Sequence, residues 1–310
     1  MKINFLKMCI IFVVTAFCVV LILNISQEVR AAGSWYVSPS GSDAYSCSTP
    51  AQPCATINGA IAKVAPGDLI YVAAGNYTGD SSRVVELNKN LTLSGGWSAN
   101  FTTQSGFSIV DGSSVANGIL VTGSVTATVR SFIIENCTSN GIYNAQSLLT
   151  VDHSVIRNNG RGIYTNGGKL ILTQSAITGN ENETEGGGGI LCRDGKLVVN
   201  NSTISSNSTI LHGGGIAAYN AMVEVNSSTI AGNIGGIDMG MGGGVTNFDG
   251  TMTLKNSIVA DNYGNWFGMD CWGDISSAGY NLIGNSSGCN FIASSGDQVD
   301  VDPLLTPLEG

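Results

Sequence analysis

Asp194 and Asp249 are the carboxylate pair in this 310-residue sequence whose placement could support acid–base chemistry. Hydrolysis of a glycosidic bond uses two carboxyl groups about 5 to 9.5 Å apart, one of which protonates the leaving group. Each aspartate precedes a glycine, and Asp-Gly is also typical of tight turns. Asp194 and Asp249 are therefore candidate catalytic residues, with plain turn positions as the alternative.

A second group of acids has the composition of a metal site. Ca²⁺ takes six to eight oxygen ligands, usually from several carboxylates. Glu181, Glu183 and Glu185 lie in the segment ENETEGG, which predicts either a Ca²⁺ site or a solvated loop. Ca²⁺ is the one cofactor for which the sequence offers ligands, and no nucleotide cofactor is expected.

The elements that position these residues come from an eleven-residue segment that occurs five times. The first copy, LTVDHSVIRNN, covers 149–159, and the others cover 170–180, 197–207, 223–233 and 252–262. Position 6 is always Ser, position 11 is always Asn, and positions 1, 3 and 8 are apolar. Apolar residues two apart, at 1 and 3 and around 8, predict two short strands joined by a bend.

A third strand and a closing turn complete each unit. Segments such as GIY at 162–164 and GGGIAA at 213–218 predict the third strand, and Asn166-Gly167 predicts a turn. Three short strands and three corners, repeated every 21 to 29 residues, are typical of one coil of a solenoid. The predicted fold class is all-β, a single-stranded parallel β-helix.

Like residues of successive coils should then lie above one another at about 4.8 Å. The Ile or Val at position 8 forms an internal stack. Position 11 forms an internal ladder in which each amide bonds the next, which satisfies polar groups that are costly to bury. The predicted ladder is Asn159, Asn180, Asn207, Asn233 and Asn262. Val129, Phe132, Ile134 and Cys137 fit an earlier, degenerate unit in which Cys137 takes the place of Asn.

The variable polar positions of the repeat should face solvent and form a long flat surface. Rows of amide and hydroxyl groups suit an extended sugar chain through many weak contacts. The predicted ligand-binding residues are Asp152, His153, Gln174, Asn200, Asn201, Glu224, Asn226 and Lys255. Asp194 and Asp249 are two coils apart, about 10 Å by strand spacing, with Asn220 between them.

Aromatic residues gather near the last coils. Trp266, Phe267 and Trp272 lie close to Cys271 in the sequence. They predict either stacking against sugar rings or a cover over the end of the solenoid.

Six of the eight cysteines follow the N-terminal segment. Cys47 with Cys54 and Cys271 with Cys289 are the predicted disulfides, although six cysteines allow fifteen pairings. Cys137 and Cys192 are about two coils apart, on the order of 10 Å, which is too far for a disulfide. They are predicted to be buried free thiols.

The two ends of the chain differ from the repeats. Ile57, Ala60, Ile61 and Val64 have helical spacing and predict a short N-terminal capping helix. Residues 1–31, with Lys2, Lys7 and a long apolar run, predict a signal peptide ending at Ala31; an uncleaved anchor is the alternative. The predicted organisation is 1–31 signal peptide, 32–124 N-terminal cap and first irregular coils, 125–285 β-helix repeats, and 286–310 C-terminal segment.

The net charge of −9 argues against nucleic acid and anionic membranes as partners. A monomer is expected, and the protein is expected to be secreted or held at the bacterial cell surface.

Three segments carry a resemblance to known proteins. The opening WYVSPSGSDAYSCSTPAQPC (35–54) resembles the start of many secreted bacterial right-handed β-helix proteins of the pectate-lyase-like superfamily. LTLSGGWSANF (91–101) and AGYNLIGN (278–285) resemble choice-of-anchor Q domain proteins. The resemblance implies a right-handed helix and export more firmly than it implies an activity. It also implies further sequence after Asp302-Pro303-Leu304-Leu305, so a truncation before a surface-attachment region is expected.

Two functions follow from these residues. The first is non-catalytic adhesion or polysaccharide binding through the polar face. The alternative is a Ca²⁺-dependent, pectate-type polysaccharide lyase acting on acidic glycans; such lyases on this fold hold Ca²⁺ with clustered Asp and use Arg or Lys as the base. Each exposed column of the repeat holds a single acid, Asp152 in one and Glu224 in the other. The sequence therefore favours binding over catalysis.

Overall fold

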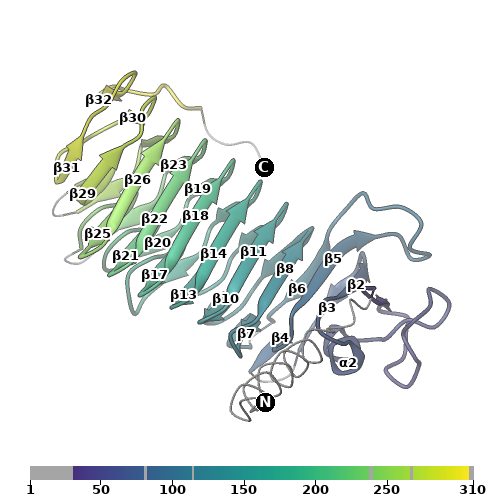
Figure 1. Ribbon diagram of the computed structural model, residues 1–310. Helices are drawn as coiled ribbons and strands as arrows, with labels where there is room; N and C mark the ends of the chain where they lie inside the picture. Colours follow the sequence, from purple (N-terminus) through teal and green to yellow (C-terminus); the bar gives the residue numbers. More distant parts are fainter. Residues whose placement is uncertain (1–30, 80–81, 114, 237–239, 266–267, 307–310) are drawn as a thin grey trace, which may run out of the picture. The chain divides into compact units, whose positions relative to one another are not determined.

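Short parallel strands, joined by turns and stacked coil upon coil, are the main elements of residues 33–306. The computed structural model describes residues 31–79, 82–113, 115–236, 240–265 and 268–306, so the predicted signal segment lies outside the described residues. Figure 1 shows the strand arrows of successive coils lying side by side along a solenoid. No helix in the described ranges is long and apolar enough to cross a membrane.

Each regular coil contributes one strand to each of three faces, and the first and last coils are incomplete. Face 1 is formed by β1 (Ser34–Val37), β2 (Asp68–Ala73), β5 (Leu91–Trp97), β8 (Thr126–Arg130), β11 (Leu148–Asp152), β14 (Lys169–Thr173), β18 (Lys196–Asn200), β22 (Met222–Asn226), β26 (Thr251–Lys255), β29 (Cys271–Ser277) and β31 (Cys289–Ile292).

Face 2 is formed by β3 (Asn76–Tyr77), β6 (Ser108–Asp111), β9 (Phe132–Glu135), β12 (Val155–Arg157), β15 (Ala176–Thr178), β19 (Thr203–Ser205), β23 (Thr229–Ala231), β27 (Ile258–Ala260), β30 (Leu282–Ile283) and β32 (Gln298–Val299).

Face 3 is formed by β4 (Arg83–Leu87), β7 (Asn117–Val121), β10 (Asn140–Ala145), β13 (Arg161–Asn166), β17 (Ile190–Arg193), β21 (Ile216–Tyr219), β25 (Val245–Phe248) and the start of β29. A short fourth row follows face 2 in the later coils: β16 (Glu181–Asn182), β20 (Ser208–Thr209), β24 (Ile234–Gly235) and β28 (Tyr263–Gly264).

The pairing register confirms the predicted coil-on-coil alignment. On face 2, Ile177 pairs with Ile156 below and with Ile204 above, and Ile204 pairs in turn with Ile230. These Ile side chains have no exposed surface, and each contributes roughly 1.5–3 kcal/mol through burial. Crossovers between parallel strands are right-handed by the general rule, and the fold is a right-handed parallel β-helix, as predicted.

The predicted asparagine ladder is present. Nδ2 of Asn180 donates to Oδ1 of Asn207 at 2.8 Å, and Nδ2 of Asn207 donates to Oδ1 of Asn233 at 2.9 Å. Asn159 and Asn262 extend the ladder in both directions at 3.0 and 2.9 Å. Oδ1 of Asn159 accepts the backbone N–H of Cys137 at 3.0 Å, which confirms Cys137 at the ladder position of the earlier coil.

The constant spacing within the repeat also places a serine ladder at the neighbouring corner. The Oγ of Ser175 accepts the N–H of Ser154, and the Oγ of Ser202 accepts the N–H of Ser175, both at 3.1 Å. The same Oγ of Ser175 donates to the Thr173 carbonyl in its own coil at 2.7 Å. Both corners are therefore joined from coil to coil by side chains that replace water as the hydrogen-bond partner.

Both ladders end on residues that the repeat does not contain. Asp270 accepts the backbone and side-chain N–H groups of Asn262, both at 2.9 Å, in the place of a further Asn. Asn281 accepts the N–H of Ser257 at 3.0 Å, and Asp297 accepts the N–H of Asn281 at 2.8 Å. Burial raises the pKa of the Asp270 carboxyl above its ordinary value.

The four cysteines predicted to pair form the two disulfides Cys47–Cys54 and Cys271–Cys289. Cys137 and Cys192 are free and buried, as predicted, and burial raises the pKa of both thiols to about 12. A thiol that resists ionisation is a poor nucleophile, so these two side chains act as small apolar groups.

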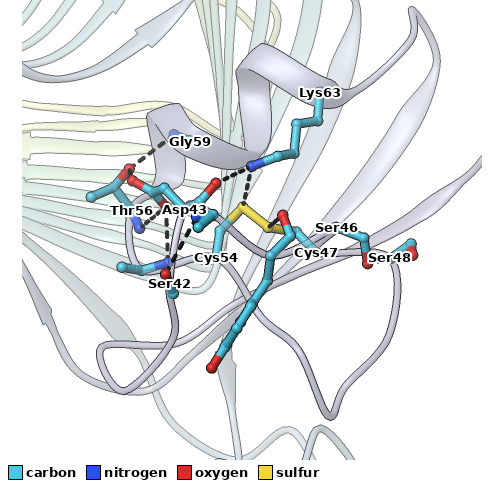
Figure 2. The surroundings of a disulfide bond; sticks show 12 residues. Ser42, Asp43, Ser46, Cys47, Ser48, Cys54, Thr56, Gly59 and Lys63 are labelled. Atoms are coloured by element: carbon cyan, nitrogen blue, oxygen red, sulfur yellow. Dashed lines mark hydrogen bonds between the residues drawn. A yellow bond between two sulfur atoms is a disulfide. The ribbon is translucent and has the colours of Figure 1, made fainter.

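The predicted N-terminal helix is confirmed as α2 (Ile57–Lys63), which buries Ile57, Ala60 and Ile61. Figure 2 shows how the adjacent disulfide loop holds it. The Asp43 carboxylate accepts the N–H and Oγ1–H of Thr56, and Oγ1 of Thr56 accepts the N–H of Gly59 at 2.9 Å. Lys63, at the other end of α2, donates to the Asp43 carbonyl at 2.6 Å. The loop therefore positions the N-cap residue Thr56 and ties the side chain of Lys63 to itself.

Candidate ligand-binding site

Five of the residues predicted to bind a ligand, Asp152, Asn200, Glu224, Asn226 and Lys255, lie on the strands of face 1. Asp152, Thr173, Asn200, Asn226 and Lys255 follow one another by strand register. Nδ2 of Asn226 donates to Oδ1 of Asn200 at 3.0 Å. The column is therefore a continuous polar row, as predicted from the repeat.

The two acids of this face are each held by a cation from a neighbouring coil. Arg130 lies 3.3 Å from the Asp152 carboxylate, and Lys196 Nζ lies 2.6 Å from Glu224 Oε1. Because each carboxylate is neutralised within the protein, neither presents a free negative charge to a ligand.

A second set of predicted residues occupies the corner between faces 1 and 2. His153, Gln174 and Asn201 have φ angles of 48°, 47° and 47°, in the left-handed region. This backbone turns the chain sharply from the face 1 strand into the face 2 strand and leaves all three side chains exposed. The buried serine of each coil follows directly, so the serine ladder fixes the height of this exposed row.

An irregular loop from an earlier coil turns this corner into a groove. Residues 98–107 leave face 1 after β5, and the Phe107 ring stacks on the His153 ring at 6.0 Å with 14° between the planes. One hollow of about 440 Å³ runs from Phe107 and His153 past Gln174 and Ala176 to Asn201. A second, of about 310 Å³, lies on the other side of the same ring pair, beside Gln104 and Arg130.

These two hollows, which share Phe107 and His153, form what we call the corner groove. Its floor is apolar at Val155 and Ala176, and its rim carries amide and imidazole groups. An apolar floor with a few polar groups at the rim is the usual composition of a small-molecule site.

The sequence predicted His153, Gln174 and Asn201 but missed Phe107, Gln104 and Arg130. Phe107 and Gln104 lie in the irregular loop before the repeats, and Arg130 belongs to the degenerate coil. One signal in the sequence could have found Arg130. By strand register Arg130 occupies the position of Asp152 in the coil before it, so it belongs to the same outward column.

The candidate acids Asp194 and Asp249 occupy turns between faces 3 and 1. Their φ angles are 50° and 55°, both side chains are exposed, and Nδ2 of Asn220 donates to Oδ1 of Asp194 at 2.7 Å. The structure thus places them in the turn positions given as the alternative, with the Asn220 amide in the coil between them.

The acids of the 181–185 segment do not converge on one point. Glu185 lies 3.6 Å from Arg161 and 3.9 Å from Arg193, while Glu181 and Glu183 are exposed. Among the residues that the structure describes, no three His, Cys, Asp or Glu side chains are grouped to hold a metal ion. The side chains present do not fit the Ca²⁺ site that the lyase alternative requires, because the available carboxylates are paired with arginine or lysine or stand singly.

The comparison with solved structures agrees with this fold. The chain is similar to the crystal structure of pectate lyase Pel9A, with a TM-score of 0.61 and 14% identity over 89% of this chain and 80% of that one. A rhamnogalacturonan lyase is matched with a TM-score of 0.44 and 15% identity over 83% and 75% of the two chains, which is too distant to support an argument. No protein-family model and no curated protein matches the chain. At these identities the likeness concerns the fold alone, a parallel β-helix of the kind found in pectate lyases.

Proposed function

We propose that this chain is an exported, non-catalytic protein that binds a polysaccharide or surface glycan in the corner groove. The observation that carries the proposal is the alignment of His153, Gln174 and Asn201 along one corner, with Phe107 packed against His153. Successive coils bring a new polar group to the groove at roughly 4.8 Å intervals. A repeating polymer can meet such a row with equivalent groups of successive units.

The groups at the groove favour binding over bond cleavage. Arg130 at the groove is paired with Asp152, and Glu224 on face 1 is paired with Lys196, which favours binding over an acid–base role for these groups. The likeness of the fold to a pectate lyase supports a glycan as ligand, and the alternative function remains a Ca²⁺-dependent lyase acting on acidic glycans. Fold likeness alone does not confer that activity.

Export is the second part of the proposal. Two disulfides are typical of proteins that mature in an oxidising compartment. The segments that resemble choice-of-anchor Q domain proteins support attachment at a bacterial surface, and the predicted signal peptide of residues 1–31 supports passage across the membrane.

Glycan-array binding of the purified protein tests the proposal. The double variant His153→Ala/Gln174→Ala should lose at least about tenfold in affinity for the best ligand, since two polar contacts are removed. Asp261→Asn, at an exposed turn on another corner, is the matched control and should bind like the wild type. Equal binding by the wild type and the double variant would contradict the groove assignment.

A parallel assay separates binding from catalysis. The protein is incubated with acidic polysaccharides and Ca²⁺, and unsaturated products are followed by ultraviolet absorbance. Turnover that a chelator abolishes would overturn the non-catalytic proposal in favour of the lyase.

A further inference from the structure

The outside of face 3 carries a row of stacked aromatic rings. The rings of Tyr143 and Tyr164 stack at 5.0 Å, those of Tyr219 and Phe248 at 4.7 Å, and Phe248 and Trp272 lie 4.7 Å apart. All five side chains are half-buried, so each ring packs on its neighbour and keeps an edge or face in solvent. Exposed stacked rings on adjacent coils form a platform for flat or ring-shaped ligands.

Two arginines join the two groups of rings. The guanidinium of Arg161 lies 5.3 Å from the centre of the Tyr164 ring, and that of Arg193 lies 4.7 Å from the centre of the Tyr219 ring. Glu185 lies within 4.0 Å of both arginines, at 3.6 and 3.9 Å. We call these five rings and the two arginines between them, from Tyr143 to Trp272, the aromatic strip.

The backbone places the strip in two columns of face 3. Register places Tyr143 beside Tyr164, and places Arg193, Tyr219 and Phe248 in one outward column of face 3. Tyr143 and Trp272 are five coil steps apart, about 24 Å by strand spacing. A linear polymer is the ligand whose length and repetition match such a surface.

Charge indicates the kind of polymer. Arg161 and Arg193 flank Glu185, and the exposed Asp194 directly follows Arg193, so Arg193 is a local cation among acids on a chain whose net charge is −9. Arg161 is already held in place: it is buried and donates to the Gly187 carbonyl and to the amide oxygens of Asn140 and Asn182.

Arg193 is less fully bonded. Its side chain is 36% exposed, its contact with Glu185 is long, and its buried Nε has no hydrogen-bond partner among the described residues. The buried Nε cannot reach a ligand, but the exposed part of the guanidinium can donate to a carboxylate or sulfate group.

We infer that the aromatic strip is a second binding site, specific for an anionic polysaccharide whose sugar rings pack on the aromatic side chains while an acidic group bonds Arg193. The inference rests on the proposed function, because it assumes a protein that meets glycans outside the cell, but it uses a different face from the corner groove. Carboxylate and sulfate share the chemistry that Arg193 would recognise, so both are tested.

The experiment measures binding of the full chain to alginate, dextran sulfate and neutral dextran. Arg193→Gln should weaken binding to the anionic polymers about tenfold or more, the loss expected for one charged hydrogen-bonded contact. Arg193→Lys keeps the positive charge but not the planar, bidentate guanidinium, so it should give an intermediate loss of affinity. A preference for alginate identifies a carboxylate ligand, and a preference for dextran sulfate identifies a sulfated one.

Matched variants decide whether the strip is responsible. Arg157→Gln removes an equally exposed cation, paired with Glu135 on face 2, and should change affinity less than about twofold. Tyr219→Ala, checked for an unchanged melting transition, should weaken binding of the anionic polymers as well. Wild-type affinity in both Arg193→Gln and Tyr219→Ala, or an equal loss in Arg157→Gln, would overturn the inference.

The corner-groove variant separates this inference from the proposed function. Loss of all glycan binding in His153→Ala/Gln174→Ala, with the strip variants unchanged, overturns the strip and supports the groove. Loss in the strip variants alone supports the strip and contradicts the groove. A wild-type protein that binds none of the polymers and no arrayed glycan contradicts both.

Discussion

An asparagine ladder runs inside the solenoid, and a single pair of asparagines on the outside makes nearly the same hydrogen bond. In the inner ladder, Asn180 donates to Asn207 at 2.8 Å; on face 1, Asn226 donates to Asn200 at 3.0 Å. The inner amides have no exposed surface, whereas the outer pair is half-buried. Water can replace the outer bond but not the inner one, so burial and not bond geometry decides what each bond contributes.

The inner row is uniform and the outer row is varied for the same reason. Every inner position must satisfy a buried backbone corner, and only a short amide both accepts from the coil below and donates to the coil above. The outer column passes through Asp152, Thr173, Asn200, Asn226 and Lys255 without disturbing the register. The inside of the solenoid therefore specifies the fold, and the outside is free to carry binding groups.

The largest contrast is expected at two adjacent residues of β19. Ile204→Asp places a carboxylate in a fully buried stack and should destabilise the protein by roughly 5 kcal/mol or more, enough to unfold several coils together. Thr203→Asp, on the outward side of the same strand, should change the free energy of unfolding by about 0.5 kcal/mol or less. Chemical denaturation measures both, and equal shifts in the midpoint would refute the inward assignment.

A smaller contrast is expected between the asparagine ladder and the outer asparagine pair. Asn207→Ala leaves the backbone N–H and the side-chain amide of Asn180 without their acceptor, which should cost roughly 2 to 4 kcal/mol. Asn200→Ala removes an amide that water can replace and should cost about 0.5 kcal/mol. A loss in Asn200→Ala as large as that in Asn207→Ala would show that burial does not separate the ladder from the outer pair.

The acids at the ends of the ladders should give opposite pH dependences. Burial raises the pKa of Asp270, so the folded state holds this proton more tightly than the unfolded state does. The resulting stability is present below the ordinary pKa and is lost as the pH rises through the raised value. For Asp297, burial is outweighed by hydrogen bonds from Ser277, Ser294 and Asn281, and the pKa is lowered, so its contribution is lost as the pH falls.

Denaturation across the acid pH range checks these signs. As the pH rises, Asp270→Asn should become more stable relative to the wild type. Over the same rise in pH, Asp297→Asn should become less stable relative to the wild type. Parallel pH profiles for the wild type and both variants would contradict the assignment.

The smallest effect is expected for the ion pair on face 1. Both side chains of the Lys196–Glu224 pair are about a third exposed or more, so Glu224→Gln should cost about 0.5 kcal/mol, and less at high salt. Denaturation at low and high ionic strength measures this. A loss of several kcal/mol in unfolding free energy that does not depend on salt would contradict this. It would show that the pair stabilises the fold as strongly as the buried ladder does.

The sequence predicted the inner architecture well because the interior imposes one requirement on every coil. Ser at position 6, Ile at position 8 and Asn at position 11 recur for that reason, and the register confirms all three columns. The disulfides, the free thiols and the capping helix were also predictable, because short loop spacing and helical spacing are local signals.

The binding surfaces were predictable only in part. His153, Gln174 and Asn201 follow from the repeat, but Phe107 reaches them from an irregular loop whose course the repeat does not encode. The strip was missed because loops of unequal length separate Tyr164, Tyr219 and Phe248 in the sequence. Trp272 lies beside Phe248 in the strip, while Trp266 and Phe267 lie outside the described residues. The role of Asp270 as the end of the asparagine ladder was not predicted, because an aspartate stands there in place of the repeated asparagine.

A pair of double-mutant cycles tests the central claim most directly. One cycle combines Asn180→Ala with Asn207→Ala inside the solenoid, and the other combines Asn200→Ala with Asn226→Ala on face 1, with unfolding free energies measured for every variant. The account predicts a coupling of roughly 1 to 3 kcal/mol for the inner pair and less than about 0.3 kcal/mol for the outer pair. Equal couplings in the two cycles would contradict it.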